Sequence, residues 1–248
     1  MFLPQLDFTG WLLIAVGMLC VGISKGGLPG VSMVQILIFA EVFPVKQSTG
    51  MLLLPLIVGD FAAIAVFHRH ADWRQLRRVL PAAAVGVVIG WFCLGRLSNE
   101  QLRPLIGIII LALSGLQILR GQFGAWIEKT YHSRFFAWSL GSLGGWTTML
   151  ANAAGPVMGL FFLAMRLPKM VFIGTTAWFF CVINLLKVPF SFQLGLITLP
   201  GLLLALLAAP VIVTGVFGGR WLLHRIPQNL FEILVLVGAM LGALKLLF

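Results

Sequence analysis

Long apolar segments are the feature that most limits what this chain can fold into. A helix of about 20 residues spans a hydrocarbon core of about 30 Å. Uninterrupted apolar runs of this kind cover residues 45–67, 76–95, 104–120, 168–187, 194–217 and 229–247. Only 10% of the 248 residues are charged, whereas soluble domains carry about 25%. We therefore predict an all-α integral membrane protein, and exclude a soluble enzyme, a nucleic-acid binder and a disordered tail.

Two further apolar segments are each interrupted near the middle by small and polar residues. The interruptions are Ser24–Gly30 and Ala151–Pro156, and both contain Gly and Pro. The apolar arms that flank them are residues 9–23 and 31–43, then 135–150 and 157–165. Because these arms are short for full crossings, they suit re-entrant hairpins, although short full spans stay an alternative.

The two interruptions belong to an internal repeat. A shift of 124 residues superposes Pro44 on Pro168, Gly50 on Gly174, Asp60 on Asn184, Gly95 on Gly219 and Arg96 on Arg220. Each half then has one broken segment followed by three spans, as in many transporters. We expect a first transmembrane repeat at residues 1–120, a cytoplasmic linker at 121–134 and a second transmembrane repeat at 135–248.

The basic residues predict how the broken segments lie in the membrane. If each segment crossed once, seven Lys and Arg would lie inside and eight outside, which favours neither orientation. If each were a hairpin returning to its own side, the division would be eleven to four, which satisfies the positive-inside rule. The cytoplasmic eleven are Arg69, Arg74, Arg77, Arg78, Arg120, Lys129, Arg134, Arg166, Lys169, Arg220 and Arg225. The hairpin arrangement predicts two inverted repeats with both termini in the periplasm.

The breaks are the first candidates for a binding site. Backbone groups freed by a break cannot face lipid, and half-helices that start there point N–H groups inward, which favours anions. Lys25 adds a positive charge, and the inverted repeat would bring both breaks together near the midplane. The candidate ligand-binding residues at the breaks are Ser24, Lys25, Gly26, Gly27, Thr147, Thr148 and Asn152. The alternative is a plain loop with Lys25 at the interface.

Three polar residues inside the spans extend the candidate site. Asp60 lies about fifteen residues into the run 45–67, where a carboxylate is costly unless it is protonated or paired. It is a candidate for proton coupling, or a structural partner of Lys25 or of a freed N–H group. Its repeat mate Asn184 can join the site or form a helix–helix hydrogen bond. Lys187, at the end of its run, can join the site, although snorkelling to the outer face is the simpler expectation.

Other polar residues predict no separate chemistry. Ser and Thr in apolar helices commonly bond to their own backbone, and we expect the polar residues that flank the breaks to be structural. They are Gln35, Ser48, Thr49, Thr175 and Thr176. The four histidines have no metal-ligand spacing, and no phosphate loop or catalytic triad order is present. We therefore expect no enzyme activity, no metal and no cofactor.

The broken segments resemble those of the sulfite exporter TauE/SafE family. The first half resembles it through Ser24–Gly30, Pro44, Gly50, Pro55 and Gly59-Asp60, and the second half through Gly144-Gly145, Thr148-Met149, Ala151–Pro156, Lys169, Phe172–Thr175, Phe179-Phe180, Asn184 and Lys187–Pro189. The resemblance covers nearly the whole chain. It implies a multi-pass protein of the bacterial inner membrane that exports sulfite, sulfoacetate or a related organosulfonate.

The resemblance and the residues together predict a secondary transporter for a small sulfur oxyanion. The expected partners are this anion and the lipid bilayer, with no nucleic acid, and a homo-oligomer is left open. An anion channel or facilitator, or an accessory membrane subunit, are the alternatives. Saturable, gradient-coupled flux distinguishes a transporter from a channel.

Overall fold

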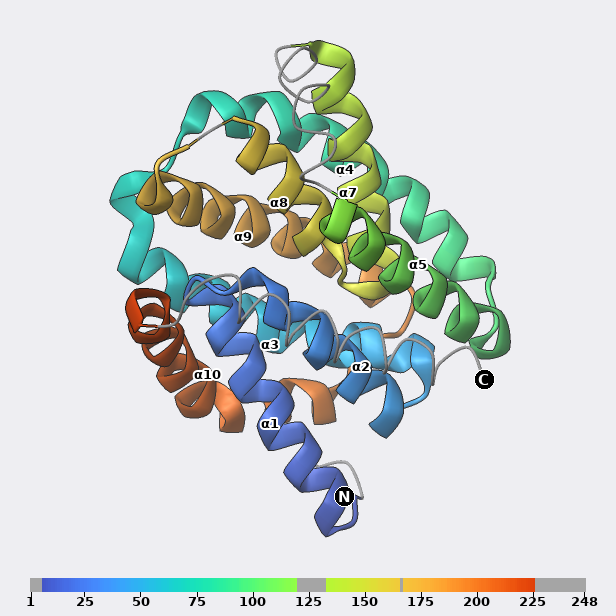
Figure 1. Cartoon of the computed structure of the whole chain (residues 1–248). Coiled ribbons are helices and arrows are strands. Elements are labelled where there is room, and N and C mark those ends of the chain that lie inside the picture. Colours follow the sequence, from blue (N-terminus) through green and yellow to red (C-terminus); the bar gives the residue numbers. More distant parts are fainter. Residues whose placement is uncertain (1–5, 120–132, 166, 226–248) are drawn as a thin grey trace.

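The computed structural model describes residues 6–119, 133–165 and 167–225, and every regular element in these ranges is a helix (Figure 1). The first half contains α1 (Phe8–Lys25), η1 (Pro29–Val31), α2 (Ser32–Val42), α3 (Val45–Phe67), η2 (His68–His70), α4 (Trp73–Arg96) and α5 (Asn99–Leu119). The second contains α7 (Arg134–Ala151), α8 (Ala154–Ala164), α9 (Lys169–Gln193) and α10 (Leu199–Arg225). The all-α prediction is confirmed. The apolar run 229–247 and residues 121–132 of the predicted linker lie outside the described residues.

Both predicted breaks are present as interruptions between a long helix and a short one. After α1, Gly27 has a φ of 126°, a backbone conformation that glycine adopts without steric cost. After α7, Asn152 has a left-handed backbone with φ 54° and ψ 26°, which Asn tolerates better than most residues. The short helices α2 and α8 have 11 residues each, about 17 Å at 1.5 Å per residue. Neither is long enough to cross a bilayer alone.

The long helices after each break start in the same way. Pro44 precedes α3 and Pro168 precedes α9, each at the N-cap position with extended ψ. Proline fits here because its fixed φ suits a helix entry, and the first N–H groups have no partner within the helix. Pro44 and Pro168 are 124 residues apart, so two positions that the predicted repeat superposes begin their helices in the same way.

Glycine pairs four residues apart let two pairs of helices approach closely. A Cβ at Gly22 of α1, or at Gly26 directly after this helix, would meet backbone of α10, at the carbonyl oxygens of Ile212 and Val216. In the other pair, a Cβ at Gly86 of α4 would meet the carbonyl oxygen of Ser142 on α7. Small residues at this spacing allow membrane helices to pack backbone against backbone. The crossings α1–α10 and α4–α7 therefore depend on glycine.

These two crossings interleave the predicted halves. They are the most extensive helix–helix contacts of the described residues. One joins α1, the first helix of the first half, to α10 in the second half, and the other joins α7, the first helix of the second half, to α4 in the first half. The helices α3 and α9 also pack against each other. The opposite membrane orientation of the halves and the re-entrant path of the broken segments remain predictions.

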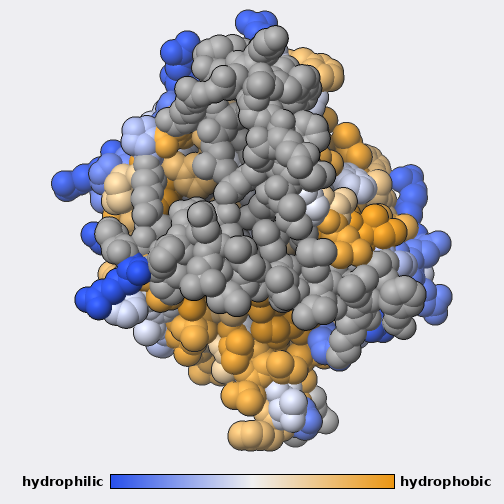
Figure 2. All heavy atoms as spheres, in the orientation of Figure 1, coloured by the Kyte–Doolittle hydropathy of each residue, from blue (hydrophilic) through white to orange (hydrophobic). Residues whose placement is uncertain are grey.

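Among the described residues, five helices are long and apolar enough to cross a membrane, and they support a multi-pass membrane protein. They are Phe8–Lys25, Val45–His70, Trp73–Arg96, Met170–Gln193 and Leu199–Leu222. Large apolar side chains on these helices are exposed, for example Leu12 and Val16 on α1 and Leu206 and Phe217 on α10. Figure 2 shows hydrophobic side chains over the lower part of one face and hydrophilic ones at its margins. A bilayer would cover such an apolar surface.

Candidate functional site

The C-terminus of α1 meets the middle of α3 through an ion pair. Lys25 Nζ lies 2.6 Å from Asp60 Oδ1, and the two side chains are 9% and 0% exposed. The ammonium group also lies 4.3 Å from the centre of the Phe180 ring on α9, within the range of a cation–π contact. Lys25 is therefore the partner that the buried carboxylate of Asp60 requires. This ion pair is one of the alternatives that the sequence left open for Asp60.

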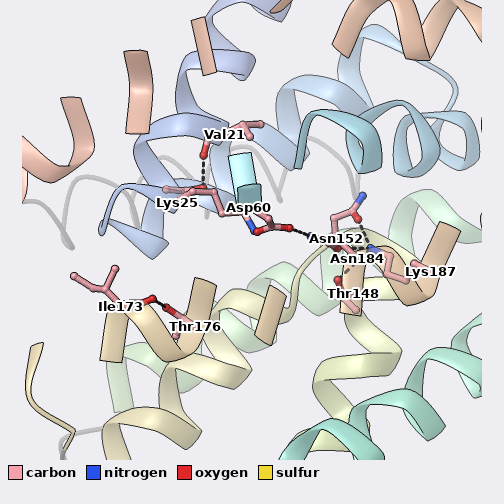
Figure 3. Close-up of polar contacts among 10 residues, drawn as sticks. Val21, Lys25, Asp60, Thr148, Asn152, Ile173, Thr176, Asn184 and Lys187 are labelled. Carbon is pink, nitrogen blue, oxygen red and sulfur yellow. Dashed lines mark hydrogen bonds and ion pairs between the residues drawn. The ribbon is translucent and has the colours of Figure 1, made fainter. Parts of the chain in front are cut away.

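The second oxygen of Asp60 is bound by its repeat mate. Asn184 Nδ2 donates a hydrogen bond of 2.7 Å to Asp60 Oδ2, and Asn184 is also buried. In Figure 3 Asp60 lies between Lys25 on one side and Asn184 on the other. The carboxylate thus joins three helices: α1 through Lys25, its own α3, and α9 through Asn184.

Lys187 is the second buried cation of the site, and the expectation that it snorkels to the outer face is wrong. It is only 2% exposed, and Nζ donates to Asn152 Oδ1, to Thr148 Oγ1 at 3.2 Å and to Asn184 Oδ1 at 3.4 Å. The reason lies in the helix length, because α9 continues to Gln193 and places Lys187 within it. Three neutral oxygens satisfy the ammonium group, but none of them balances its charge.

Asn152 connects the second break to the long helices α3 and α9. Its amide oxygen accepts from Lys187 on α9, and Nδ2 donates 2.9 Å to the carbonyl oxygen of Thr49 on α3. Its left-handed backbone allows the chain to leave α7 and enter α8 after a short turn. The residue therefore fixes the break and binds one helix from each half.

A continuous polar chain results, from Lys25 through Asp60, Asn184 and Lys187 to Asn152. With two ammonium groups and one carboxylate, its formal charge is +2 − 1 = +1. Burying charge is costly unless it is paired and hydrogen-bonded, so an unbalanced positive charge favours an anion nearby. The chain can therefore attract an anion and hold it by polar contacts.

A cavity lies beside this polar chain, between the two breaks. The space open to the centre of a water molecule is about 50 Å³, several times the ~10–15 Å³ needed for one water. Its polar lining comes from both broken segments and α9: Ser24, Lys25, Gly27, Ser32, Gln35, Thr148, Asn152, Gly155, Gly159, Thr176 and Asn184. Its apolar walls are Leu56, Phe172, Ile173, Ala177 and Phe180.

The first turns of both short helices contribute to this cavity. Ser32 begins α2, and Gly155 lies at the start of α8. The first N–H groups of a helix have no partner within the helix, and the helix dipole makes this end attractive to anions. With Lys25, the site has the donors and the charge for a compact anion with several oxygens.

The predicted site residues separate into two groups. The cavity is lined by Ser24, Lys25, Gly27, Thr148, Asn152 and Asn184, and Lys187 contacts three of these behind the cavity wall. Gly26 instead lies at the crossing with α10, where a Cβ would meet the Val216 carbonyl oxygen. Thr147 donates back to the Leu143 carbonyl of its own helix at 2.9 Å. The participation of these two residues in binding remains a prediction without a contact to the cavity.

The residues expected to be structural mostly are. The hydroxyls of the four Ser and Thr residues that flank the breaks donate to the carbonyls of Val45, Lys46, Val171 and Ile173 in their own helices. Thr176 and Gln35 also line the cavity, and Gln35 differs from the other four because its Oε1 is buried without a hydrogen-bond partner among the described residues. The sequence signal for Gln35 is its position three residues after Ser32, on the same face of α2. Phe180 and Gly159 also line the cavity, although the sequence did not indicate them as candidate site residues.

Metal ligation finds no support in the described ranges, where no three His, Cys, Asp or Glu side chains come together.

The comparison with protein families matches residues 12–246 to the family described as Sulfite exporter TauE/SafE. Searches of curated proteins and of solved structures gave no match. The family match includes both breaks and the polar chain between them.

Proposed function

Because the chain belongs to the sulfite exporter TauE/SafE family, whose members are membrane transporters of sulfur anions, we propose that it exports a small sulfur oxyanion through the cavity between its two breaks. Sulfite, sulfoacetate and related organosulfonates are the candidate substrates. The observation that supports this site best is the Lys25–Asp60 pair beside that cavity. The pair presents a cation to the cavity while keeping its charge balanced when the cavity holds no anion.

The binding step uses donors from both halves of the chain. Lys25 supplies the charge, and the N-termini of α2 and α8 supply backbone dipoles. Asn184 and Asn152 hold Asp60 and Lys187 in place behind the cavity. Since each break contributes to the same pocket, a small movement of one half against the other would open the site to one side of the membrane.

Proton coupling through Asp60 is the finer part of the proposal. An anion that binds Lys25 competes with Asp60 Oδ1 for the same ammonium group. A buried carboxylate that loses its cation is costly, and uptake of one proton by Asp60 removes that cost. The charged groups that face Asp60 are Lys25 and, through Asn184, Lys187. Anion and proton would then move together.

The proposed setting is the bacterial inner membrane, with both termini periplasmic and the linker at residues 121–134 cytoplasmic. This placement rests on the eleven-to-four division of basic residues. A reporter inserted in the linker tests it, because eight simple crossings place the linker and the C-terminus on the same side. A cytoplasmic linker with a periplasmic C-terminus agrees with hairpins, and a shared location contradicts them.

The function is tested by flux of sulfite, sulfoacetate and sulfate into proteoliposomes, with and without a pH gradient. We expect saturable flux of one sulfur oxyanion that responds to the gradient and is lost in Lys25→Ala. Lys46→Ala is the matched control, because Lys46 lies at the start of α3, where its Nζ donates to the Leu97 carbonyl, away from the cavity. Unchanged flux in Lys25→Ala would exclude this site, and no flux of any sulfur oxyanion would exclude the function.

A further inference from the structure

Gln35 lines the cavity and carries a buried acceptor without a hydrogen-bond partner among the described residues. Its side chain lies on α2, one turn after Ser32, and is 1% exposed. Oε1 is buried and has no hydrogen-bond partner among the described residues, although Gln35 lines the cavity. The other two side-chain amides of the cavity, Asn152 and Asn184, donate and accept within the polar chain.

An unused acceptor does not fit an anion that has only acceptor oxygens. A fully deprotonated oxyanion brings no N–H or O–H donor, and its oxygens would face the carbonyl oxygen of Gln35 unfavourably. A buried polar group without a partner is costly, so such a group in a binding site marks a ligand atom of the complementary kind. The complementary atom here is a donor.

We propose that the transported ligand is a singly charged sulfur oxyanion with an O–H or N–H donor, which Gln35 accepts while Lys25 binds the anionic oxygens. The inference rests on the proposed function and narrows its substrate class. One negative charge matches the formal charge of +1 that the polar chain carries while Asp60 is ionised. The donor can be the hydroxyl of hydrogensulfite or a hydroxyl or amino group on a short-chain sulfonate.

The walls of the cavity leave room for a short carbon chain. Leu56, Ile173 and Phe180 are apolar lining residues, and apolar walls with few polar groups are typical of sites for small organic ligands. Gly159 lies 124 residues after Gln35 and lines the same cavity, and a Cβ built there meets no atom within 4 Å. The shift of 124 residues superposes Gln35 on Gly159, so one position places an amide beside the cavity and the other leaves open space there.

Two shape-matched ligand pairs test the donor. We would measure competition for flux in proteoliposomes of the full chain, with 2-hydroxyethanesulfonate against propane-1-sulfonate, and hydrogensulfite against methanesulfinate. Each pair exchanges a hydroxyl for a methyl group and keeps the charge. We expect the hydroxyl member to be preferred by about 10-fold or more, because a site with an unpaired acceptor rejects the analogue that lacks the donor. The pair with the larger preference identifies the source of the donor.

Gln35→Met should remove the preference while flux of the methyl member continues, since Met has a similar size and no strong acceptor. The matched control is Gln47→Met, because Gln47 is exposed at the start of α3 and is not part of the cavity. If Gln35→Met does not fold, Gln35→Asn, whose shorter side chain withdraws the amide, takes its place. The wild-type comparison needs no variant.

Equal flux of both members in the wild type overturns the inference and leaves the proposed function intact. A Gln35→Met protein that loses flux of both members equally also overturns it, because the amide would then donate through Nε2 to the anion itself. If the wild type transports none of the four compounds, nor sulfite, sulfoacetate or sulfate, the proposed function fails and this inference fails with it.

Discussion

Asn184 and Asp60 stand 124 residues apart in the sequence and are joined by a hydrogen bond of 2.7 Å, from Nδ2 of the amide to Oδ2 of the carboxylate. They are the residues that the repeat superposes, on the two long helices α3 and α9 that pack against each other. One member carries a charge and the other does not. The centre of the site is therefore made of equivalent positions that differ in chemistry.

This pairing predicts the result of exchanging the two residues. In Asp60→Asn/Asn184→Asp the hydrogen bond can form again, and the carboxylate moves from Lys25 toward Lys187, whose Nζ lies 3.4 Å from the oxygen of Asn184. We expect the double variant to fold and its transport to fall by at least 10-fold, because Lys25 loses its counter-charge. Thermal unfolding in detergent and flux in proteoliposomes measure the two effects. Transport at the wild-type level would show that the position of the charge is irrelevant.

Breaking the ion pair from the lysine side should cost more stability than removing the whole pair. Lys25→Met leaves Asp60 buried and without its cation, which costs about 3–5 kcal/mol in buried pairs. Lys25→Met/Asp60→Asn removes both charges, so we expect its unfolding temperature to recover most of the loss. Transport should be absent in both variants. Equal unfolding temperatures of the single and double variants would contradict a stabilising pair.

The sequence predicted the helices well because the length of an apolar run, and the Gly, Pro and Asn residues that interrupt it, are local properties of the sequence. The breaks at Gly27 and Asn152 are local in the same sense, since each has a backbone conformation that suits its residue type. A charged residue in an apolar run is also recognisable by its cost, so Lys25 and Asp60 were identified as candidates. Their contact, which the sequence left open, depends on how α1 meets α3.

The placements of Lys187, Gln35 and Gly26 depended on tertiary structure. Lys187 ended the predicted apolar run, but α9 extends to Gln193 and buries it. Gln35 was expected to be structural, and only the surrounding packing shows that its Oε1 has no partner among the described residues. Gly26 belongs to a conspicuous Gly-rich motif, yet its lack of a side chain serves the contact with α10. Each depends on a helix far away in the sequence.

Asn152 combines a backbone role with a side-chain role, and two substitutions separate them. Asn152→Gly keeps an easy left-handed backbone but removes the contacts to Lys187 and Thr49. Asn152→Ala removes the contacts and adds left-handed strain of about 1 kcal/mol. We expect both to lose transport, with Asn152→Ala unfolding at the lower temperature. Transport by the Gly variant at the wild-type rate would assign Asn152 to the backbone alone.

Two adjacent glycines of α10 test the helix crossing. A Cβ at Gly219 would meet the carbonyl oxygen of Ile23 on α1, whereas a Cβ at Gly218 meets no atom within 4 Å. Gly219→Ala should therefore destabilise the protein by about 1–3 kcal/mol through overpacking. Gly218→Ala should be neutral or more stable by up to about 1 kcal/mol, because alanine favours the helix. Thermal unfolding of the two variants measures the difference, and similar values would argue against close packing here.

Gly159 offers a way to narrow the cavity without disturbing the fold. It lies within α8, lines the cavity and has open space where a Cβ would project. Gly159→Ala should leave the unfolding temperature unchanged or raise it, by up to about 1 kcal/mol in stability, because alanine is the better helix former. The added methyl group reduces the space for the ligand, so we expect weaker transport of organosulfonates than of sulfite, and Gly159→Leu should block both.

Gly115→Ala on α5, where a Cβ also meets no atom within 4 Å, is the control. Organosulfonate flux through Gly159→Leu at the wild-type rate would place the transport route outside this cavity.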